Sequence, residues 1–171
     1  MKNTILIMSG AINAMTLGAI LALALNSGYG PDLDAKQVEC MAKNVYFESR
    51  GEPIEGQIAV AHVTMNRVKH SEWPDEVCKV VYDYKQFSWT FLLKKEEQTP
   101  QDVRAWKTAV VVARDVMIGN TTDPTSGAQF YHAGYVNPEW NKYMKVSKII
   151  GQHIFYKWDG QWTIKHKPKS Q

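Results

Sequence analysis

One carboxylate stands out among the charged residues because of its place on a predicted helix. Glu48 lies three residues after Val45 and seven after Met41, so it continues the apolar face of that helix. It also lies in the last turn, where the carbonyl end of the helix dipole disfavours a negative charge. Partial burial and the dipole would both raise its pKa, and a carboxyl group that stays protonated near neutral pH can serve as a general acid. On position alone, a structural ion pair with Arg50 or Arg67 is the favoured interpretation.

The elements predicted around Glu48 are helices in the first part of the chain and strands in the last. Asp34 would cap the first helix, with Gln37 as its capping-box partner, and Asp159-Gly160 would form a hairpin turn. Helices followed by a small antiparallel sheet indicate an α+β domain. The predicted helices cover 34–51, 53–69 and 99–120, and the predicted strands cover 129–132, 152–158 and 161–164.

The length and composition of the chain narrow the class of protein. Its 171 residues suit one domain and leave little room for two. A hydrophobic share of 44% with 22% charged residues excludes disordered and fibrous classes, and a mean hydropathy of −0.35 excludes a polytopic membrane protein. The net charge of +3 suits an anionic partner, such as a bacterial envelope polymer, without requiring one.

The N-terminal residues are predicted to lie outside the fold. Residues 5–25 carry no charge and are long enough to span a bilayer, and Lys2 before them places the rest of the chain outside the cytoplasm by the positive-inside rule. Ten of these residues are small or polar, so the segment is only weakly hydrophobic. A signal peptide cleaved after Ala24 and an uncleaved anchor, held transiently at the inner membrane, both stay open. Residues 1–31 are assigned to this leader and linker, and 32–171 to the domain.

The two cysteines fit an exported protein. Cys40 and Cys78 form an even pair, and such a pair outside the cytoplasm favours a disulfide. A bridge across this loop would stabilise the fold by about 4 kcal/mol. A nucleophilic cysteine assisted by a histidine is the alternative, but neither cysteine has a sequence context that supports it. The sequence contains no Cys-x-x-Cys and no His-Glu-x-x-His, so no metal site or cofactor is expected.

Several short motifs, taken in order, resemble the SleB/CwlJ-like family of cell wall hydrolases, the spore-cortex-lytic type. Each motif alone is weak, but the ordered set is specific and covers roughly residues 36 to 158. One small departure is Ser49, where alanine is commoner. The motifs are Y-F-E-S-R-G-E-P (46–53), E-G-Q-I-A-V-A (55–61), N-R-V (66–68), V-C-K-V-V-Y (77–82), Q-F-S-W (86–89), F-Y-H-A (130–133), P-E-W (138–140) and I-G-Q-H-I-F-Y (150–156).

The resemblance implies a compact lysozyme-like α+β fold, similar to lytic transglycosylases, that cleaves peptidoglycan between N-acetylmuramic acid and N-acetylglucosamine. It also implies that Glu48 is the catalytic acid, which reverses the interpretation from position alone. Polar and aromatic groups in the motifs are candidates for holding sugar hydroxyls or stacking on sugar faces, although core packing explains the aromatic ones equally well. These candidates are Gln86, Phe87, Ser88, Trp89, Tyr131, His132 and Trp140, whereas His153 is interpreted as a hydrogen-bonded structural imidazole.

The number of carboxylates bears on the mechanism. A retaining or inverting hydrolase needs a second acid across the scissile bond. Asp75, Asp83 and Glu139 are near the motifs but are not core motif acids, and Glu52 is predicted to be a solvated acid. One acid is enough for a lytic transglycosylase, because Glu48 could protonate the glycosidic oxygen and then accept the proton of the sugar's own 6-hydroxyl.

Two other functions remain open from the sequence. A peptidoglycan-binding module without catalysis is the main alternative, and export together with the absence of a basic helix face argues against nucleic-acid binding. A single catalytic domain behind a weakly hydrophobic leader suggests a phage lysis enzyme, an endolysin, that acts as a monomer. Such an enzyme would work at the host inner membrane and in the periplasm or cell wall. A bacterial enzyme of cell wall remodelling is the alternative role.

Overall fold

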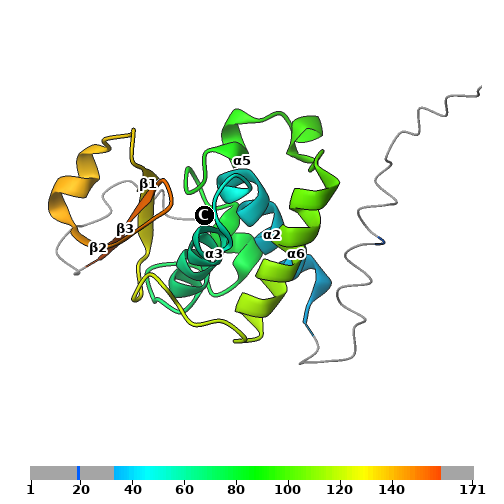
Figure 1. Cartoon of the computed structure of the whole chain (residues 1–171), viewed down its shortest axis with the longest axis horizontal. Helices are drawn as coiled ribbons and strands as arrows, with labels where there is room; N and C mark the ends of the chain where they lie inside the picture. The colour runs from blue at the N-terminus through cyan, green and yellow to red at the C-terminus, as the bar shows by residue number, and fades with distance from the viewer. Residues whose placement is uncertain (1–18, 20–32, 159–171) are drawn as a thin grey trace, which may run out of the picture.

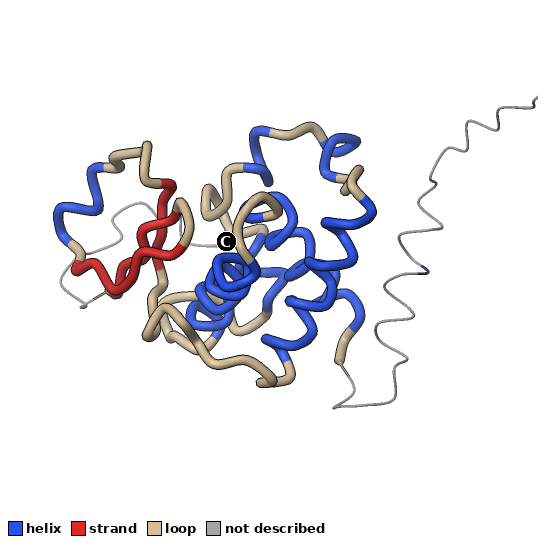
Figure 2. The backbone as a smooth tube through the Cα atoms, viewed as in Figure 1, coloured by secondary structure: helices blue, strands red, loops and turns tan. Residues whose placement is uncertain are grey.

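The structure is a computed structural model that describes Ala19 and residues 33–158. Its longest elements are the helices α2 (Ala35–Ser49), α3 (Ile54–Val68) and α6 (Val103–Met117). These helices gather in one lobe, and a three-stranded antiparallel sheet lies beside that lobe (Figure 1, Figure 2). The other elements are α4 (Val77–Val81), α5 (Trp89–Leu92), the 3₁₀ helices η1 (Lys95–Gln98) and η2 (Glu139–Tyr143), and the strands β1 (Phe130–Ala133), β2 (Lys145–Ile150) and β3 (His153–Lys157).

Side-chain caps set where the long helices begin. The Asp34 carboxylate accepts the backbone N–H of Lys36, which caps α2 as predicted. Asp102 caps α6 by accepting the N–H groups of Arg104 and Ala105 at 2.9 and 3.0 Å. α6 therefore begins at Val103, four residues after the predicted start at 99, because Asp102 is the residue that satisfies the first free N–H groups.

The core of the helical lobe lies between α2 and α6. Val38, Met41 and Val45 are fully buried on one face of α2 and pack in one cluster with Trp106 and Val110 of α6. Burying each such side chain stabilises the fold by about 1.5–3 kcal/mol. The apolar stripe predicted from the sequence is therefore confirmed, and it fixes the direction in which the last turn of α2 presents its side chains.

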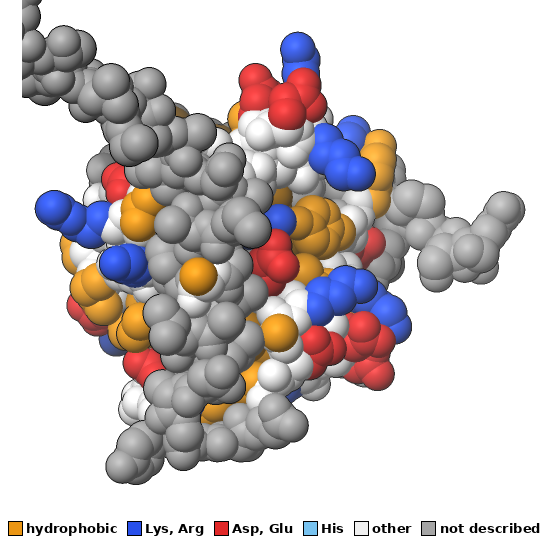
Figure 3. All heavy atoms as spheres, turned by 90° about the vertical axis from the view of Figure 1, so that its right-hand side faces the viewer, with side chains coloured by type: hydrophobic (Ala, Val, Ile, Leu, Met, Phe, Trp, Pro, Cys, Tyr) orange, Lys and Arg blue, Asp and Glu red, His pale blue; other side chains and the backbone are white. Residues whose placement is uncertain are grey.

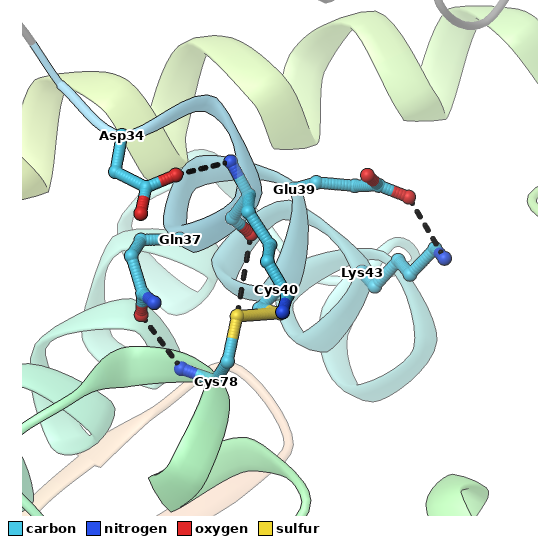
Figure 4. The surroundings of a disulfide bond; sticks show 7 residues. Asp34, Gln37, Glu39, Cys40, Lys43 and Cys78 are labelled. Carbon is cyan, nitrogen blue, oxygen red and sulfur yellow. Dashed lines mark hydrogen bonds and ion pairs between the residues drawn. A yellow bond between two sulfur atoms is a disulfide. The ribbon is translucent and has the colours of Figure 1, made fainter.

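A disulfide joins α2 to α4. Cys40 and Cys78 are bonded, with their Cα atoms 5.2 Å apart, so the predicted pairing is confirmed (Figure 4). Gln37 does not complete a capping box, because its Oε1 accepts the backbone N–H of Cys78 at 2.9 Å instead. The capping-box prediction is wrong at this residue, since a tertiary contact takes the side chain.

The sheet has the order β1-β3-β2, with β3 antiparallel to both neighbours. Strands were predicted over 129–132 and 152–158, but β2 was not predicted, because five of its six residues are partly or fully exposed and a bulge interrupts its alternation. The turn Asp159-Gly160 and the strand over 161–164 lie outside the described residues. β1 and β2 pair with the two edges of β3.

One acid fastens the sheet to the helical lobe. The Glu52 carboxylate accepts the backbone N–H of Gln152 at 2.9 Å, in the turn between β2 and β3. A side chain at Gly151, where φ is 57°, would collide with that carboxylate. The prediction that Glu52 is a solvated acid is therefore wrong, and this residue helps to hold the two lobes together.

The face shown in Figure 3 carries charges of both signs. On the face turned to the viewer in Figure 3, basic and acidic side chains are interspersed, and hydrophobic ones lie in small groups. Within the described part of the chain, no helix combines the length and the apolar character needed to cross a membrane. Nearly all of the candidate membrane segment 5–25 lies outside that part.

Candidate active site around Glu48

Glu48 lies in the last turn of α2, where the helical lobe meets the sheet. The Tyr131 hydroxyl, from β1, donates a hydrogen bond of 2.9 Å to its Oε2. The backbone N–H of Ser88, in the segment before α5, also donates to this carboxylate. Groups from three separate parts of the chain therefore meet at one carboxyl group, which is partly buried.

Opposing effects act on the pKa of Glu48. Burial raises the pKa and is the largest influence, whereas the Tyr131 hydrogen bond, the positive charge of Arg67 and the Ser88 N–H lower it. The net result is a raised pKa, as the sequence predicted. The site can therefore hold a proton on Glu48 and can also stabilise the carboxylate once that proton has left.

Arg67, on α3, is the buried cation of the site. Its Nε donates to the backbone oxygen of Gln129 at 2.8 Å, and its guanidinium lies 5.0 Å from the ring centre of Phe87 and 5.6 Å from that of Phe130. Burial lowers its pKa to about 10, so it remains charged at neutral pH. Its Nη1 is buried and makes no hydrogen bond within the described structure.

The structural role first favoured for Glu48 is not what the structure shows. In the described residues, neither Arg50 nor Arg67 makes an ion pair with Glu48. The Arg50 guanidinium lies 4.9 Å from the ring centre of Tyr46, and Arg67 acts on Glu48 through its charge alone. The carboxyl group is thus held by hydrogen bonds from Tyr131 and Ser88 instead of an ion pair.

Buried residues of the Q-F-S-W motif hold Ser88 in position. Trp89 donates from Nε1 to Oδ1 of the fully buried Asn44 at 3.0 Å, and Asn44 donates in turn to Oγ1 of Thr64 at 3.2 Å. Phe87 and Trp89 are only 2% and 4% exposed, so their rings pack inside the protein. A buried polar chain that is fully hydrogen-bonded is rigid, and this one fixes the segment that carries Ser88 to both α2 and α3.

The structure brings only some of the predicted substrate residues to the candidate acid. Ser88 and Tyr131 contact Glu48 directly. Gln86 lies in the same segment as Ser88, and its Nε2 donates to the backbone oxygen of Tyr84 at 3.4 Å. Ser88 and Tyr131 therefore form the polar surroundings of Glu48, and Gln86 contacts its own loop.

His132 and Trp140 lie on the other face of the sheet. Successive side chains of a strand point to opposite faces, so Tyr131 and its neighbour His132 cannot both face Glu48. The His132 ring hydrogen-bonds with the Tyr156 hydroxyl at 2.8 Å and with the backbone oxygen of Ala133 at 2.9 Å. Trp140, from η2, packs edge-on against both the His132 and Tyr156 rings.

None of the three acids considered as a second carboxylate acts on Glu48. Asp75 lines a groove together with Asp34, at the opposite end of α2 from Glu48. Asp83 raises the pKa of Arg67, but no acid is among the groups that shift the pKa of Glu48. Glu139 is exposed and belongs to η2, the element that carries Trp140.

Sequence reasoning missed the supporting role of two residues. Asn44 lies four residues before Glu48, so a polar side chain on the apolar face of α2 was a readable signal for a buried hydrogen bond. Arg67 was considered only as a structural ion-pair partner of Glu48, and no local pattern reveals its burial. His153 was expected to be hydrogen-bonded, but its buried Nδ1 has no partner in the described structure, and its ring packs 5.1 Å from that of Tyr131.

Comparison with known proteins gives the family. The family model described as Cell Wall Hydrolase matches residues 51–156, a range that contains Arg67, Ser88 and Tyr131 and begins three residues after Glu48. Spore cortex-lytic enzymes of Oceanobacillus iheyensis and Bacillus cereus are 33% and 32% identical over 127 and 123 residues. Each alignment covers 70% of this chain but only 41% and 44% of those proteins, so the chain spans less than half their length.

Solved structures share the fold over most of the described residues. The catalytic domain of the germination-specific lytic transglycosylase SleB from Bacillus anthracis is 32% identical, with a TM-score of 0.60, and the match covers 77% of this chain and 98% of that one. The catalytic domain of the Bacillus cereus SleB protein is also 32% identical, with a TM-score of 0.59 and coverage of 78% and 96%. The predicted α+β fold is confirmed, and the chain belongs to the cell wall hydrolase family.

Proposed function

We propose that this protein cleaves peptidoglycan glycan strands between N-acetylmuramic acid and N-acetylglucosamine, as a lytic transglycosylase. The observation that carries the proposal is the partly buried carboxyl group of Glu48, which accepts a hydrogen bond from the Tyr131 hydroxyl and whose pKa is raised by burial. Its relatives, which are spore cortex-lytic enzymes and a lytic transglycosylase, support the same chemistry.

The reaction would use Glu48 twice. Protonated Glu48 gives its proton to the glycosidic oxygen, and the bond from that oxygen to C1 of the muramic sugar breaks. The Glu48 carboxylate then takes the proton of the sugar's 6-hydroxyl as O6 bonds to C1, which closes a 1,6-anhydro ring without water. Between the two steps, the Tyr131 hydroxyl, the Ser88 N–H and the Arg67 charge stabilise the carboxylate.

The predicted substrate residues divide into three roles in this proposal. Ser88, Gln86 and Tyr131 would contact the sugar nearest Glu48. Phe87 and Trp89 would act indirectly, because they are buried beneath that surface. For His132 and Trp140 we propose a separate contact with the wall polymer, along the outer face of the sheet.

Cleavage must be distinguished from mere binding to the wall. Purified sacculi incubated with the protein should lose turbidity and release soluble fragments that contain both amino sugars. Co-sedimentation of the protein with sacculi that stay intact would instead establish the binding module and reject the enzyme.

Tyr131→Phe should change the pH dependence of cleavage. Loss of the hydroxyl removes an influence that lowers the pKa of Glu48, so that pKa should rise further. Because the protonated form of Glu48 is the active acid, the alkaline limb of the pH–rate profile should move to higher pH by about one pH unit. The maximal rate should fall, because Glu48 becomes a weaker acid in the variant.

The matched control for this variant is Tyr135→Phe. Tyr135 is 86% exposed, and the tyrosine that hydrogen-bonds to Glu48 is Tyr131. The rates of glycan-strand cleavage, measured over about five pH units around neutrality, should be the same for this control and for the wild type. An alkaline limb that does not move in Tyr131→Phe would contradict the role assigned to the hydroxyl.

The setting proposed for this activity is lysis of a bacterial host by a phage enzyme that is exported to the inner membrane and periplasm. The charge-free segment 5–25 supports export, and its small and polar residues support release from the membrane. N-terminal sequencing of the exported protein separates a retained segment, which begins at the original N-terminus, from cleavage after Ala24.

A further inference from the structure

A groove with a volume of about 440 Å³ adjoins the Glu48 site and has no role in the cleavage step. It lies where the end of α2, the α5 and η1 segment and the start of α6 meet. Ser88 belongs to both places, because its N–H donates to Glu48 while the residue also lines the groove. The lining residues are Tyr46, Phe47, Arg50, Ser88, Trp89, Leu92, Leu93, Glu97, Thr99 and Gln101.

Part of the groove lining is apolar and rigid. Phe47 and Trp89 stack with their ring centres 4.8 Å apart and their planes at 21°, and Trp89 is tethered through its ring nitrogen. Leu92, which is 71% exposed, and Leu93 add aliphatic surface. Such a lining suits small methyl-bearing groups, and a volume in the range of about 300–1,000 Å³ is usual for sites that hold small ligands.

Two charges of opposite sign also line the groove. Arg50 is exposed at the end of α2, with its guanidinium over the Tyr46 ring, so its direction is set by that contact. Glu97 is exposed, and its Oε2 accepts the backbone N–H of Lys94 at 2.8 Å, which holds the carboxylate in place. An occupant that carries both a carboxylate and an ammonium group would match this pair.

The substrate itself contains such a group. The backbone of the glycan is uncharged along its amino sugars, but muramic acid bears a lactyl-linked peptide stem with alanine methyls, carboxylates and an amino group. We propose that this groove binds the peptide stem, with a stem carboxylate on Arg50 and the methyl groups against Phe47 and Leu92. The inference rests on the proposed function, because only a glycan strand held at Glu48 would bring its stem past Ser88.

The test compares glycan strands that carry stems with strands from which an amidase has removed them. The wild type should bind the stem-bearing strands more tightly, and Arg50→Gln should raise KM for those strands about tenfold relative to the KM for stem-free strands. Arg50→Lys should keep part of the preference, because it keeps the charge. Lys148→Gln, an exposed change on β2, should keep the wild-type ratio.

The outcomes separate this inference from the function on which it rests. If the wild type cleaves neither kind of strand, the proposed function is wrong. If it cleaves both, and Arg50→Gln raises the two KM values equally or changes neither, Arg50 does not bind the stem and the inference is overturned. Circular dichroism of each variant shows that the comparison is made on folded protein.

Discussion

Glu48→Gln is expected to lower the rate of glycan cleavage by about 10²–10⁴-fold, the contribution of a well-placed general acid. The amide has almost the same shape as the carboxyl group, and its oxygen can still accept the Tyr131 hydrogen bond. It cannot, however, deliver a proton to the glycosidic oxygen. The fold should therefore survive while the chemistry is lost.

Clearing of sacculi, measured together with helical circular dichroism, checks this result. Glu55→Gln is the matched control, because Glu55 is an exposed acid in the first turn of α3 and the same change there should leave clearing at the wild-type rate. Clearing by Glu48→Gln within a few-fold of the wild type would remove Glu48 from the mechanism.

Replacing both cysteines by serine is expected to lower the free energy of unfolding by about 4 kcal/mol. The bond joins residues 38 positions apart, so breaking it restores the conformational entropy of a long loop to the unfolded chain. It ties α4 to α2, and two residues of α4, Val77 and Val81, are buried in the same core as the apolar face of α2. Loss of the bond should therefore destabilise the packing on which Glu48 depends.

Urea unfolding of the Cys40→Ser, Cys78→Ser variant measures this effect. The reduced wild type serves as the control and should unfold at nearly the same urea concentration as the variant, whereas the oxidised wild type should need more. If the free energy of unfolding of the variant lies within about 1 kcal/mol of that of the oxidised wild type, the loop is already constrained by its packing without the bond.

The local parts of this account could be predicted from the sequence, and the tertiary ones could not. Periodic apolar residues predicted α2 and α3 within two residues of their observed ends, because helix packing repeats every three to four residues. The same spacing placed Glu48 at the edge of the core. By contrast, the sequence could not show that Tyr131 is its partner, since 83 residues separate the two.

The errors also have physical causes. Adjacent motif residues Tyr131 and His132 were expected to serve one site, but the pleat of β1 turns them to opposite faces. Gln37 was expected to cap its own helix, but the N–H of Cys78 competes for its side chain. β2 was missed because it lacks a regular alternation of buried and exposed residues.

The central claim is that Glu48 acts alone and that the sugar's own hydroxyl, not water, completes the reaction. Digestion of glycan strands in ¹⁸O-labelled water, followed by mass spectrometry of the fragments, tests it most directly. The account predicts 1,6-anhydromuramic ends, lighter by one water than reducing ends and free of ¹⁸O. Reducing muramic ends that carry ¹⁸O would contradict it, because they would require a water nucleophile and a second group to activate it.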